Sequence, residues 1–383
     1  NSTYYTKIIT RRNKMGRELR RILGSVDKVI FTIVLVLCAF GILMVYSATK
    51  SLNGGIKYPI VQFAAFLIGF VCMLFMISFD YECFGNKTRI LYTLNIALLA
   101  VVLFIGTGEE VGTKGWIRFG GIGIQPSELV KIGFVLTFAK HLEREEENIN
   151  RLMPFAGMFV HAAIIIGMVL LQPDYGTAMV YMFMFICMVF AAGLHLRWFA
   201  AAGAGFAAFA PIAWFFILRK YQKERFITFL HPELDPSGSG YQVIQSKVAI
   251  GSGELTGRSL FNGSQTQLGI LPAKHTDFIF GVIGEELGFI GALFVVTLLI
   301  ALVIKCFMTA SSSRTAYGKY ICIGIGAMFL FQIFENIGMC VGLMPVTGIP
   351  LPFISYGGSS MLTNLIAVGI VMSVSARKKT INF

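Results

Sequence analysis

Charge is scarce in this sequence. Only 14% of its 383 residues are Asp, Glu, Lys or Arg, whereas about a quarter is usual in a soluble domain. Hydrophobic residues make up 56%, and the mean hydropathy is +0.73. The apolar residues form blocks long enough to cross a bilayer, which takes roughly 20 residues per helix. The composition excludes an ordinary soluble protein and predicts an integral membrane protein.

Paired cysteines and clustered histidines are also missing. The seven cysteines have no paired spacing and most lie in apolar blocks, which is typical of packing residues and not of a disulfide or metal framework. None of the five histidines has metal-ligand spacing, so we assign no metal-binding residue. No repeat, no second soluble domain and no small-residue cleavage site after the first apolar block is visible. We therefore expect that block to be a retained span.

Acidic residues are outnumbered, 20 against 32 basic residues, which gives a net charge of +12. Such an excess can indicate nucleic-acid binding. Here most basic residues flank apolar blocks, with runs in the segment before the first block and at 377–379. This placement is typical of residues that orient a protein in a membrane. We predict no nucleic-acid partner.

Ten apolar blocks follow one another along the chain. They lie near 27–48, 58–79, 89–106, 126–142, 153–172, 176–194, 198–218, 277–304, 317–343 and 357–376. An even number of crossings puts both termini on one side, and the basic ends indicate the cytoplasm. The predicted fold is an all-α, polytopic membrane helical bundle of about ten transmembrane helices. It forms one domain over 27–379, after a basic cytoplasmic arm at 1–26.

That orientation places 107–125, 219–276 and 344–356 outside. The segment 219–276 is a large extracytoplasmic loop between spans seven and eight, and loops of that length are usually functional or disordered. A short interfacial helix is expected near 241–250. Basic residues in these outer segments fit either lipid headgroups or a phosphate-bearing ligand. They are Lys114, Arg118, Arg219, Lys220, Lys223, Arg225, Lys247, Arg258 and Lys274.

Asp277 is the most informative residue, because it stands where a polar loop meets the eighth span. Partial desolvation there would raise the pKa of its carboxyl and make it a proton acceptor near neutral pH. The alternative is a helix N-cap, a role that suits both Thr276 and Asp277. Farther along, Glu285, Glu286 and Glu335 lie inside spans. We expect all three to make structural polar contacts.

Three further segments carry polar residues at span ends. At the start of the fourth span, Glu128 and Lys131 share a helix face, so they either neutralise each other or hold a diphosphate. Asp174 stands in a tight outer turn as either an N-cap or a functional residue. The Pro/Gly-rich segment 345–360 brings backbone close to the tenth span, whose first N–H groups suit an anion. We count Ser355, Tyr356, Ser359 and Lys274 among the candidate substrate-binding residues.

Five stretches, in this order, resemble the SEDS family of shape, elongation, division and sporulation proteins, over nearly the whole chain from 27 to 379. They are GWIRF at 115–119 with QPSEL at 125–129, QPDYGT at 172–177, DPSGSGYQ at 235–242, HTDFIF at 275–280 with GEELG at 284–288, and PLPFISYGGSS at 350–360. Segments 244–253, 336–339 and 346–352 resemble the elongation branch more than the division branch. The sporulation paralogue stays open.

The resemblance implies a ten-span fold and peptidoglycan glycosyltransferase activity on lipid II, which extends a nascent glycan chain. It also implies a class B penicillin-binding protein (a transpeptidase) as partner, in the bacterial cytoplasmic membrane, with the active site on the extracytoplasmic face. Asp277 matches the family's essential aspartate. Glu128, Lys131 and Asp174 match functionally sensitive positions, and Trp116 and Arg118 match motif positions.

The implied reaction is an inverting single displacement, which needs one carboxylate base, and Asp277 is our candidate. Lys131, Arg118 or a divalent cation would stabilise the leaving pyrophosphate. Two alternatives stay open. A transporter of the lipid-linked precursor fits the composition, although the polar residues gather at one face and do not cross the midplane. A non-catalytic scaffold for the partner synthase predicts that Asp277→Asn is silent.

Overall fold

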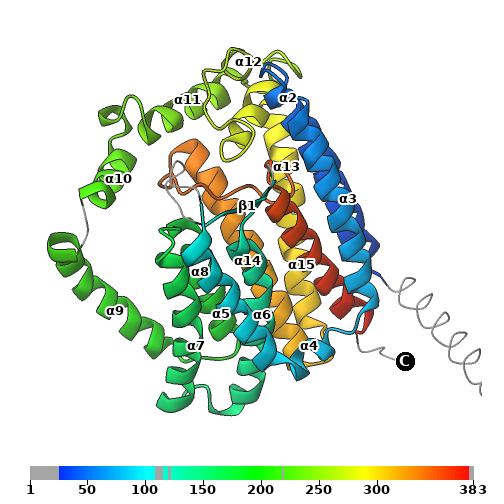
Figure 1. Ribbon diagram of the computed structural model, residues 1–383, viewed down its shortest axis with the longest axis vertical. Coiled ribbons are helices and arrows are strands. Elements are labelled where there is room, and N and C mark those ends of the chain that lie inside the picture. The colour runs from blue at the N-terminus through cyan, green and yellow to red at the C-terminus, as the bar shows by residue number, and fades with distance from the viewer. Residues whose placement is uncertain (1–25, 108–114, 120–121, 218–219, 379–383) are drawn as a thin grey trace, which may run out of the picture.

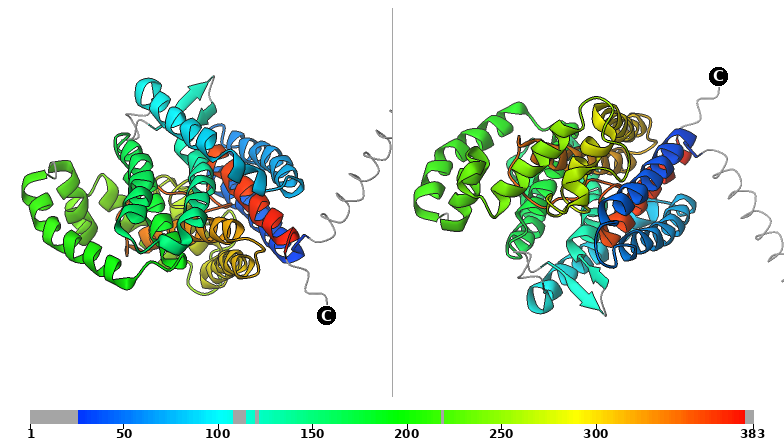
Figure 2. Two further views of the ribbon diagram at one scale, coloured as in Figure 1. Left: turned by 90° about the horizontal axis from the view of Figure 1, so that it is seen from below. Right: turned by 90° about the horizontal axis from the view of Figure 1, so that it is seen from above.

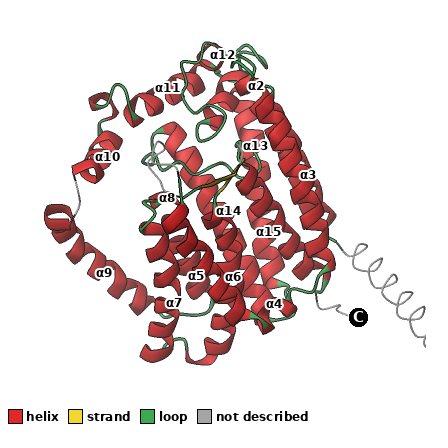
Figure 3. Cartoon of the chain, viewed as in Figure 1, coloured by secondary structure: helices red, strands yellow, loops and turns green. Residues whose placement is uncertain are grey.

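The chain folds into a bundle of long helices with only two short strands (Figure 3). The computed structural model describes residues 26–107, 115–119, 122–217 and 220–378. Each of the predicted apolar blocks contains one long helix. These helices are α2 Lys28–Thr49, α3 Lys57–Ser78, α5 Thr88–Ile105, α6 Pro126–Glu145, α7 Leu152–Leu170, α8 Tyr175–Ala191, α9 Leu196–Ile212, α13 Ile279–Ser311, α14 Ala316–Val341 and α15 Gly358–Ala376.

In the described part of the chain, 8 of these helices are long and apolar enough to cross a membrane. The other two are α8, which is apolar but has only 17 residues, and α6, whose charged residues lower its hydropathy. The predicted polytopic, all-α membrane fold is confirmed. One predicted boundary was short, because α13 continues to Ser311 and the expected block ended at 304.

Helices α14 and α15 form the centre of the bundle. Of their most apolar stretches, 78% and 83% of the residues are buried, against 22% for α3 and 17% for α5. Helix α3 lies along α15, while α14 packs against α6, α8 and α13 (Figure 1). The outer helices turn apolar side chains outward, as a lipid environment requires, and buried polar residues lie on the central pair and on the faces of the other helices that point into the bundle.

Helix α9 and the helix after it lie to one side of the bundle in all three views, and the chain then leads back over the end of the bundle (Figures 1 and 2). Helix α9 buries none of its described residues. After a π-helical turn at Ala213–Ile217 come α10 Lys220–Leu230, a 3-10 turn at Pro232–Leu234, α11 Ser239–Ser252 and α12 Ser264–Gln267. Helix α11 packs on α13 and α14, which confirms a short helix around 241–250.

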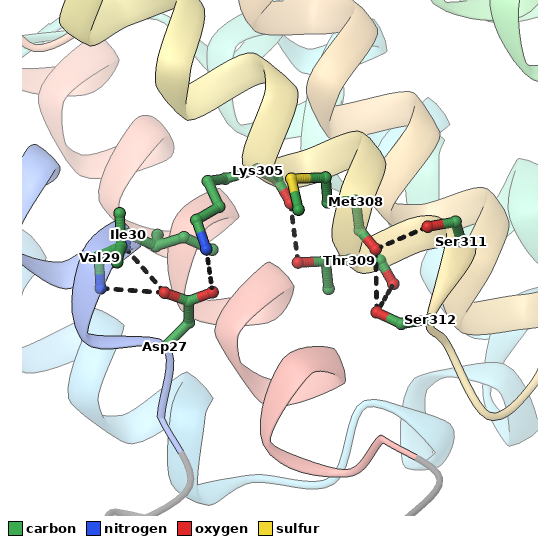
Figure 4. Close-up of polar contacts among 8 residues, drawn as sticks. All are labelled: Asp27, Val29, Ile30, Lys305, Met308, Thr309, Ser311 and Ser312. Carbon is green, nitrogen blue, oxygen red and sulfur yellow. Dashed lines mark hydrogen bonds and ion pairs between the residues drawn. The ribbon is translucent and has the colours of Figure 1, made fainter. Parts of the chain in front are cut away.

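The start of α2 and the end of α15 lie at the same end of the bundle. Asp27 caps α2 by accepting from the Val29 N–H at 2.9 Å, and its second oxygen pairs with Lys305 of α13 at 2.9 Å (Figure 4). Arg377 donates to the Ile77 carbonyl, at the end of α3. This arrangement agrees with an even number of crossings. The predicted arm at 1–26 lies almost wholly outside the described residues and stays a prediction.

At the opposite end, a hairpin joins α5 to α6. Strands β1 Ile117–Phe119 and β2 Ile122–Ile124 pair antiparallel, with Arg118 opposite Gly123. A bridge between Thr107 and Trp116 extends the hairpin toward α5. Lys114 and Arg219, two of the predicted basic outer residues, lie outside the described residues. The hairpin, α12, the segment before α13 and the α14–α15 connection meet at this end.

Candidate functional site

Asp277 lies directly before α13, but it does not cap the helix. The N-cap residue is Phe278, and no side chain accepts a capping hydrogen bond there. The backbone of Asp277 is fixed, because its carbonyl accepts from Asn336 Nδ2 at 2.8 Å. The N-cap alternative for Thr276 and Asp277 was therefore wrong. The carboxylate is not used to build the helix.

The Asp277 carboxylate faces the connection between α14 and α15. Its Oδ2 would lie 3.6 Å from a Cβ placed on Gly348, an ordinary contact distance, and the φ of +76 at Gly348 favours glycine there. The side chain is half-buried, and no described residue donates a hydrogen bond to it. Loss of hydration raises the pKa of Asp277 to about 6. A carboxylate with these properties is suited to accept a proton near neutral pH.

The α14–α15 connection, residues 342–357, is held by hydrogen bonds to α14 and to the segment before α13. We name it the shared loop. Asn336 Nδ2 donates to the Ile349 carbonyl at 2.8 Å as well as to Asp277. The Thr347 hydroxyl donates to Glu335 Oε1 at 3.0 Å. The Ser355 hydroxyl donates to the Thr276 carbonyl at 2.7 Å. The loop and the Asp277 segment are thus held together as one unit.

A second group of charged residues lies at the start of α6 and α8. Lys131 Nζ bonds Glu128 Oε1 at 2.7 Å, with side-chain exposures of 1% and 4%. Asp174 caps α8 by accepting from the Thr177 N–H at 3.1 Å and also accepts from Gln125 Nε2 at 2.9 Å. Burial raises the pKa of Asp174, and the Glu128 carboxylate adds to that rise. Asp174 is therefore an N-cap, as one alternative predicted. The other alternative, a functional residue, stays a prediction, because this capping carboxylate also lies inside the charged group.

The shared loop connects the two groups. A Cβ on Gly176, in the first turn of α8, would lie 2.9 Å from the Thr347 carbonyl oxygen. Thr347 precedes Gly348, which faces Asp277. The start of α8 and the Asp277 carboxylate therefore border the same few residues of the loop. The structure brings Asp174 and Asp277 to one end of the bundle, on either side of that loop.

The remaining candidates frame this end. Ser359 Oγ accepts from the Gln125 N–H at 3.2 Å, which joins α15 to the hairpin. The Tyr356 N–H donates to the His275 carbonyl at 2.9 Å, two residues before Asp277. Trp116 lies beside Gly123, whose added Cβ would stand 3.0 Å from the indole, and Arg118 is exposed. Arg118 is thus the candidate cation that reaches solvent.

Lys274 is not directed at Asp277. Its ammonium donates to the Thr266 carbonyl and to Ser51 Oγ at 3.0 Å, and its side chain is buried. Lys131 is also bonded internally. Two of the candidate substrate-binding cations therefore already have partners, and one of them, Lys131, was proposed for the pyrophosphate. The interior of a membrane protein must satisfy its own charges.

The three span carboxylates make the structural contacts predicted for them. Glu285 accepts from the Gln265 N–H at 2.7 Å and the Thr266 N–H at 3.0 Å. Glu286 accepts from Ser47 at 2.5 Å, which ties α13 to α2. Gly288, with φ +65, breaks the regular helix two residues after Glu286. Glu335 holds Thr347.

Sequence reasoning missed Gln62. Its Nε2 donates to the Ser355 carbonyl at 3.0 Å, and its Oε1 accepts from the Gly357 N–H at 3.1 Å. The side chain is fully buried. A lone amide in the otherwise apolar block 58–79 was the available signal, since such a group needs internal partners.

No three His, Cys, Asp or Glu side chains gather as a metal site in the part of the chain that the structure describes. A divalent cation bound here would take most of its ligands from substrate phosphates and water, as Mg²⁺ commonly does. The structure offers it no dedicated set of protein ligands.

Comparison with known proteins identifies the family. A sequence model of the FtsW/RodA/SpoVE cell cycle proteins matches residues 27–380. The chain belongs to this family. Among its relatives are a probable peptidoglycan glycosyltransferase FtsW of Trichlorobacter lovleyi, 37% identical over 93% of this chain and 95% of that protein. Another is the peptidoglycan glycosyltransferase MrdB of Escherichia coli K12, 36% identical over 93% and 95%.

Solved structures agree with membership of the FtsW/RodA/SpoVE family. A chain from a peptidoglycan synthase complex that coordinates polymerization and crosslinking matches with a TM-score of 0.79 and 32% identity, over 91% of this chain and 97% of that one. RodA of Thermus thermophilus, a rod shape determining protein, matches with a TM-score of 0.70 and 27% identity, over 93% and 98%. The predicted SEDS resemblance is confirmed.

Proposed function

We propose that this chain is a peptidoglycan glycosyltransferase that joins lipid II disaccharide units into glycan chains. The observation that carries the proposal is the Asp277 carboxylate, which is half-buried, has a pKa of about 6 and lacks a hydrogen-bond partner among the described residues. Structural carboxylates of this protein, such as Glu285 and Glu286, are bonded instead. Relatives over nearly the whole chain carry the same activity in their names.

In the proposed reaction, a sugar hydroxyl of one lipid-linked unit attacks the anomeric carbon of another. The new C–O bond forms as the bond to the pyrophosphate breaks, and that electron pair leaves with the pyrophosphate. Asp277 takes the hydroxyl proton. An α-linked donor gives a β-linked product, which is a single displacement with inversion. General-base assistance of this kind contributes roughly 10²–10⁴-fold in rate.

The other candidates are proposed to hold the substrate. Arg118 is exposed on the hairpin and can approach a phosphate, and Trp116 supplies an aromatic face beside it. Ser355, Tyr356 and Ser359 border the same end. We propose that the Lys131–Glu128 pair and Asp174 keep the start of α6 and α8 in place and polarise the site.

We propose that this end of the bundle faces outward from the bacterial cytoplasmic membrane, with both termini inside. The basic terminal runs support that orientation. A class B penicillin-binding protein is the proposed partner, supported by the structural relative from a synthase complex. Within the family we favour the elongation branch, RodA, on segments 244–253, 336–339 and 346–352.

The test is Asp277→Asn in the full chain, assayed for glycan polymerisation with lipid II, with and without the partner. We expect at least a hundredfold loss of rate with unchanged thermal unfolding, because the amide cannot accept the proton. Asp80→Asn, a half-exposed carboxylate at the other end, is the matched control and should keep its rate. Near wild-type polymerisation by Asp277→Asn would defeat the assignment. Scrambling of lipid II by wild type without polymerisation would favour the transporter.

A further inference from the structure

A cavity adjoins the first residues of the shared loop. Its volume is about 140 Å³, well above the roughly 10–15 Å³ that a single water needs. It is bounded by the end of α10, by α11 and by the first residues of the shared loop. The lining includes Thr228, Phe229, Val243, Lys247, Met344 and Val346. One cation and several apolar walls therefore surround it.

Lys247 is the cation of this cavity, and no described residue holds its ammonium by a hydrogen bond or ion pair. The Glu233 carboxylate interacts with Lys247 only electrostatically, and the acidic groups of this segment have hydrogen-bond partners of their own. Glu233 pairs with His231 at 3.1 Å, and Asp235 accepts from the Gly238 N–H at 2.9 Å. Lys131 and Lys274, by contrast, are buried and bonded. Lys247 thus remains available for an anion at this end of the bundle.

The cavity is joined to the reacting carboxylate through the shared loop. Gly342, which has φ +79, lies under the Lys247 side chain, and an added Cβ would stand 3.3 Å from its Nζ. Val346 lines the cavity, and Gly348, two residues later, faces Asp277. The shared loop thus borders both the cavity and the Asp277 carboxylate, although Asp277 does not line the cavity itself.

The surroundings of the cavity point to a lipid-linked anion. Leu230 and Leu234, beside it, are 69% and 66% exposed. Exposed apolar side chains of a loop at the membrane interface are suited to contact acyl or isoprenoid chains. A ligand with a phosphate attached to an apolar chain fits this site, because its phosphate can meet the Lys247 ammonium and its chain can contact the apolar walls.

We propose that Lys247, with the Thr228 hydroxyl, binds the diphosphate of a polyprenyl-diphosphate-linked substrate, and that Phe229, Val243 and Met344 contact its first isoprenoid unit. This inference rests on the proposed function, and it adds a second cation to Arg118, because Lys131 is already paired with Glu128. The subsite positions the lipid-linked end while Asp277 acts on the sugar.

The test uses the full chain in detergent with farnesyl diphosphate as the probe. We expect Lys247→Gln to weaken its binding roughly ten- to a hundredfold, because a charge-assisted hydrogen bond is lost. The KM for lipid II should rise by a similar factor, with kcat within about twofold of wild type. Lys247→Arg should restore most of both. Lys50→Gln removes an equal charge beside Phe261, outside the cavity, and should change neither.

Two further probes separate the sources of the anion. Inorganic pyrophosphate should bind more weakly than farnesyl diphosphate; equal binding would overturn the isoprenoid contact. Vesicles of phosphatidylglycerol test a headgroup site, and a Lys247→Gln effect confined to them would also overturn the proposal. So would unchanged farnesyl diphosphate binding. Asp277→Asn should bind the probe as wild type does. If the wild-type chain binds the probe through Lys247 but does not polymerise lipid II, the proposed function is refuted and this subsite is left intact.

Discussion

Hydrogen bonding separates the carboxylates that stabilise the fold of this protein from the carboxylate proposed as the base. Glu285 and Glu286 each accept hydrogen bonds from other segments of the fold. Asp277 accepts none among the described residues, although it lies at a boundary where desolvation disfavours charge. A partly buried carboxylate without partners destabilises the folded protein unless it takes up a proton or meets a ligand. The carboxylate of Asp277 therefore lowers the stability of the folded protein.

The raised pKa of Asp277 predicts a pH dependence. The ionised form is the base, so polymerisation should rise as pH rises through about 6 and be half-maximal near that value. Below it, the rate should fall about tenfold per pH unit, since the protonated carboxyl cannot accept a proton. Initial rates with lipid II at fixed ionic strength measure this. A rate that is constant across the same range would exclude Asp277 as the titrating base.

Residue types and spacing predicted the candidates, but not which of them were already paired. Asp277 was recognised because a carboxylate follows a polar loop at a span boundary. The internal bonds of Lys274 were invisible, because its partners, Thr266 and Ser51, lie 8 and 223 positions away. Such long-range pairings leave no periodic signal in a single sequence.

At the scale of elements, α6 shows how a charged pair can lie inside a membrane helix. Glu128 and Lys131 are separated by one turn and neutralise each other at 2.7 Å. Glu128 Oε2 has no hydrogen-bond partner in the structure, so the pair is incompletely satisfied. Breaking it leaves a buried charge alone, which is far more costly than removing both charges.

This pair predicts a non-additive effect on stability. Lys131→Met should destabilise the protein by about 3–5 kcal/mol, because Glu128 is left buried and unpaired. Adding Glu128→Gln should recover much of that loss. Thermal unfolding of both variants in the same detergent measures the difference. Equal destabilisation by the single and the double variant would show that the two side chains do not act as a pair.

Element boundaries followed well from hydropathy, because spans require long apolar runs. Helix α6 was still identified by its Pro126 start and its apolar positions, although its charges lower its mean hydropathy. The hairpin Ile117–Ile124 was missed, because its pattern of isoleucine and glycine does not differ from a loop. The shared loop's contacts with α8 and α14 also needed the structure.

At the scale of the whole molecule, the two ends differ in character. One end carries the Asp27–Lys305 pair and the Arg377 contacts that fasten helix ends. The other gathers the hairpin, α11, α12 and the shared loop around Asp277. This polarity suits a protein that acts at one membrane face.

The proposed orientation predicts the labelling of single cysteines in intact cells. In a chain lacking the other cysteines, Cys83, which is exposed near the Asp27 end, should not react with a membrane-impermeant maleimide. Leu255→Cys, at a position 67% exposed in the α11–α12 connection, should react. Permeabilised cells provide the control in which both react. The reverse pattern would invert the topology and place Asp277 in the cytoplasm.

The shared loop has a mechanical consequence. Because Thr347 abuts the first turn of α8 and the neighbouring Gly348 faces Asp277, a displacement of an ångström there alters two acidic environments simultaneously. A neighbouring protein that binds this connection and shifts it can thus change the proton affinity of both carboxylates and the access of a ligand to them at the same time.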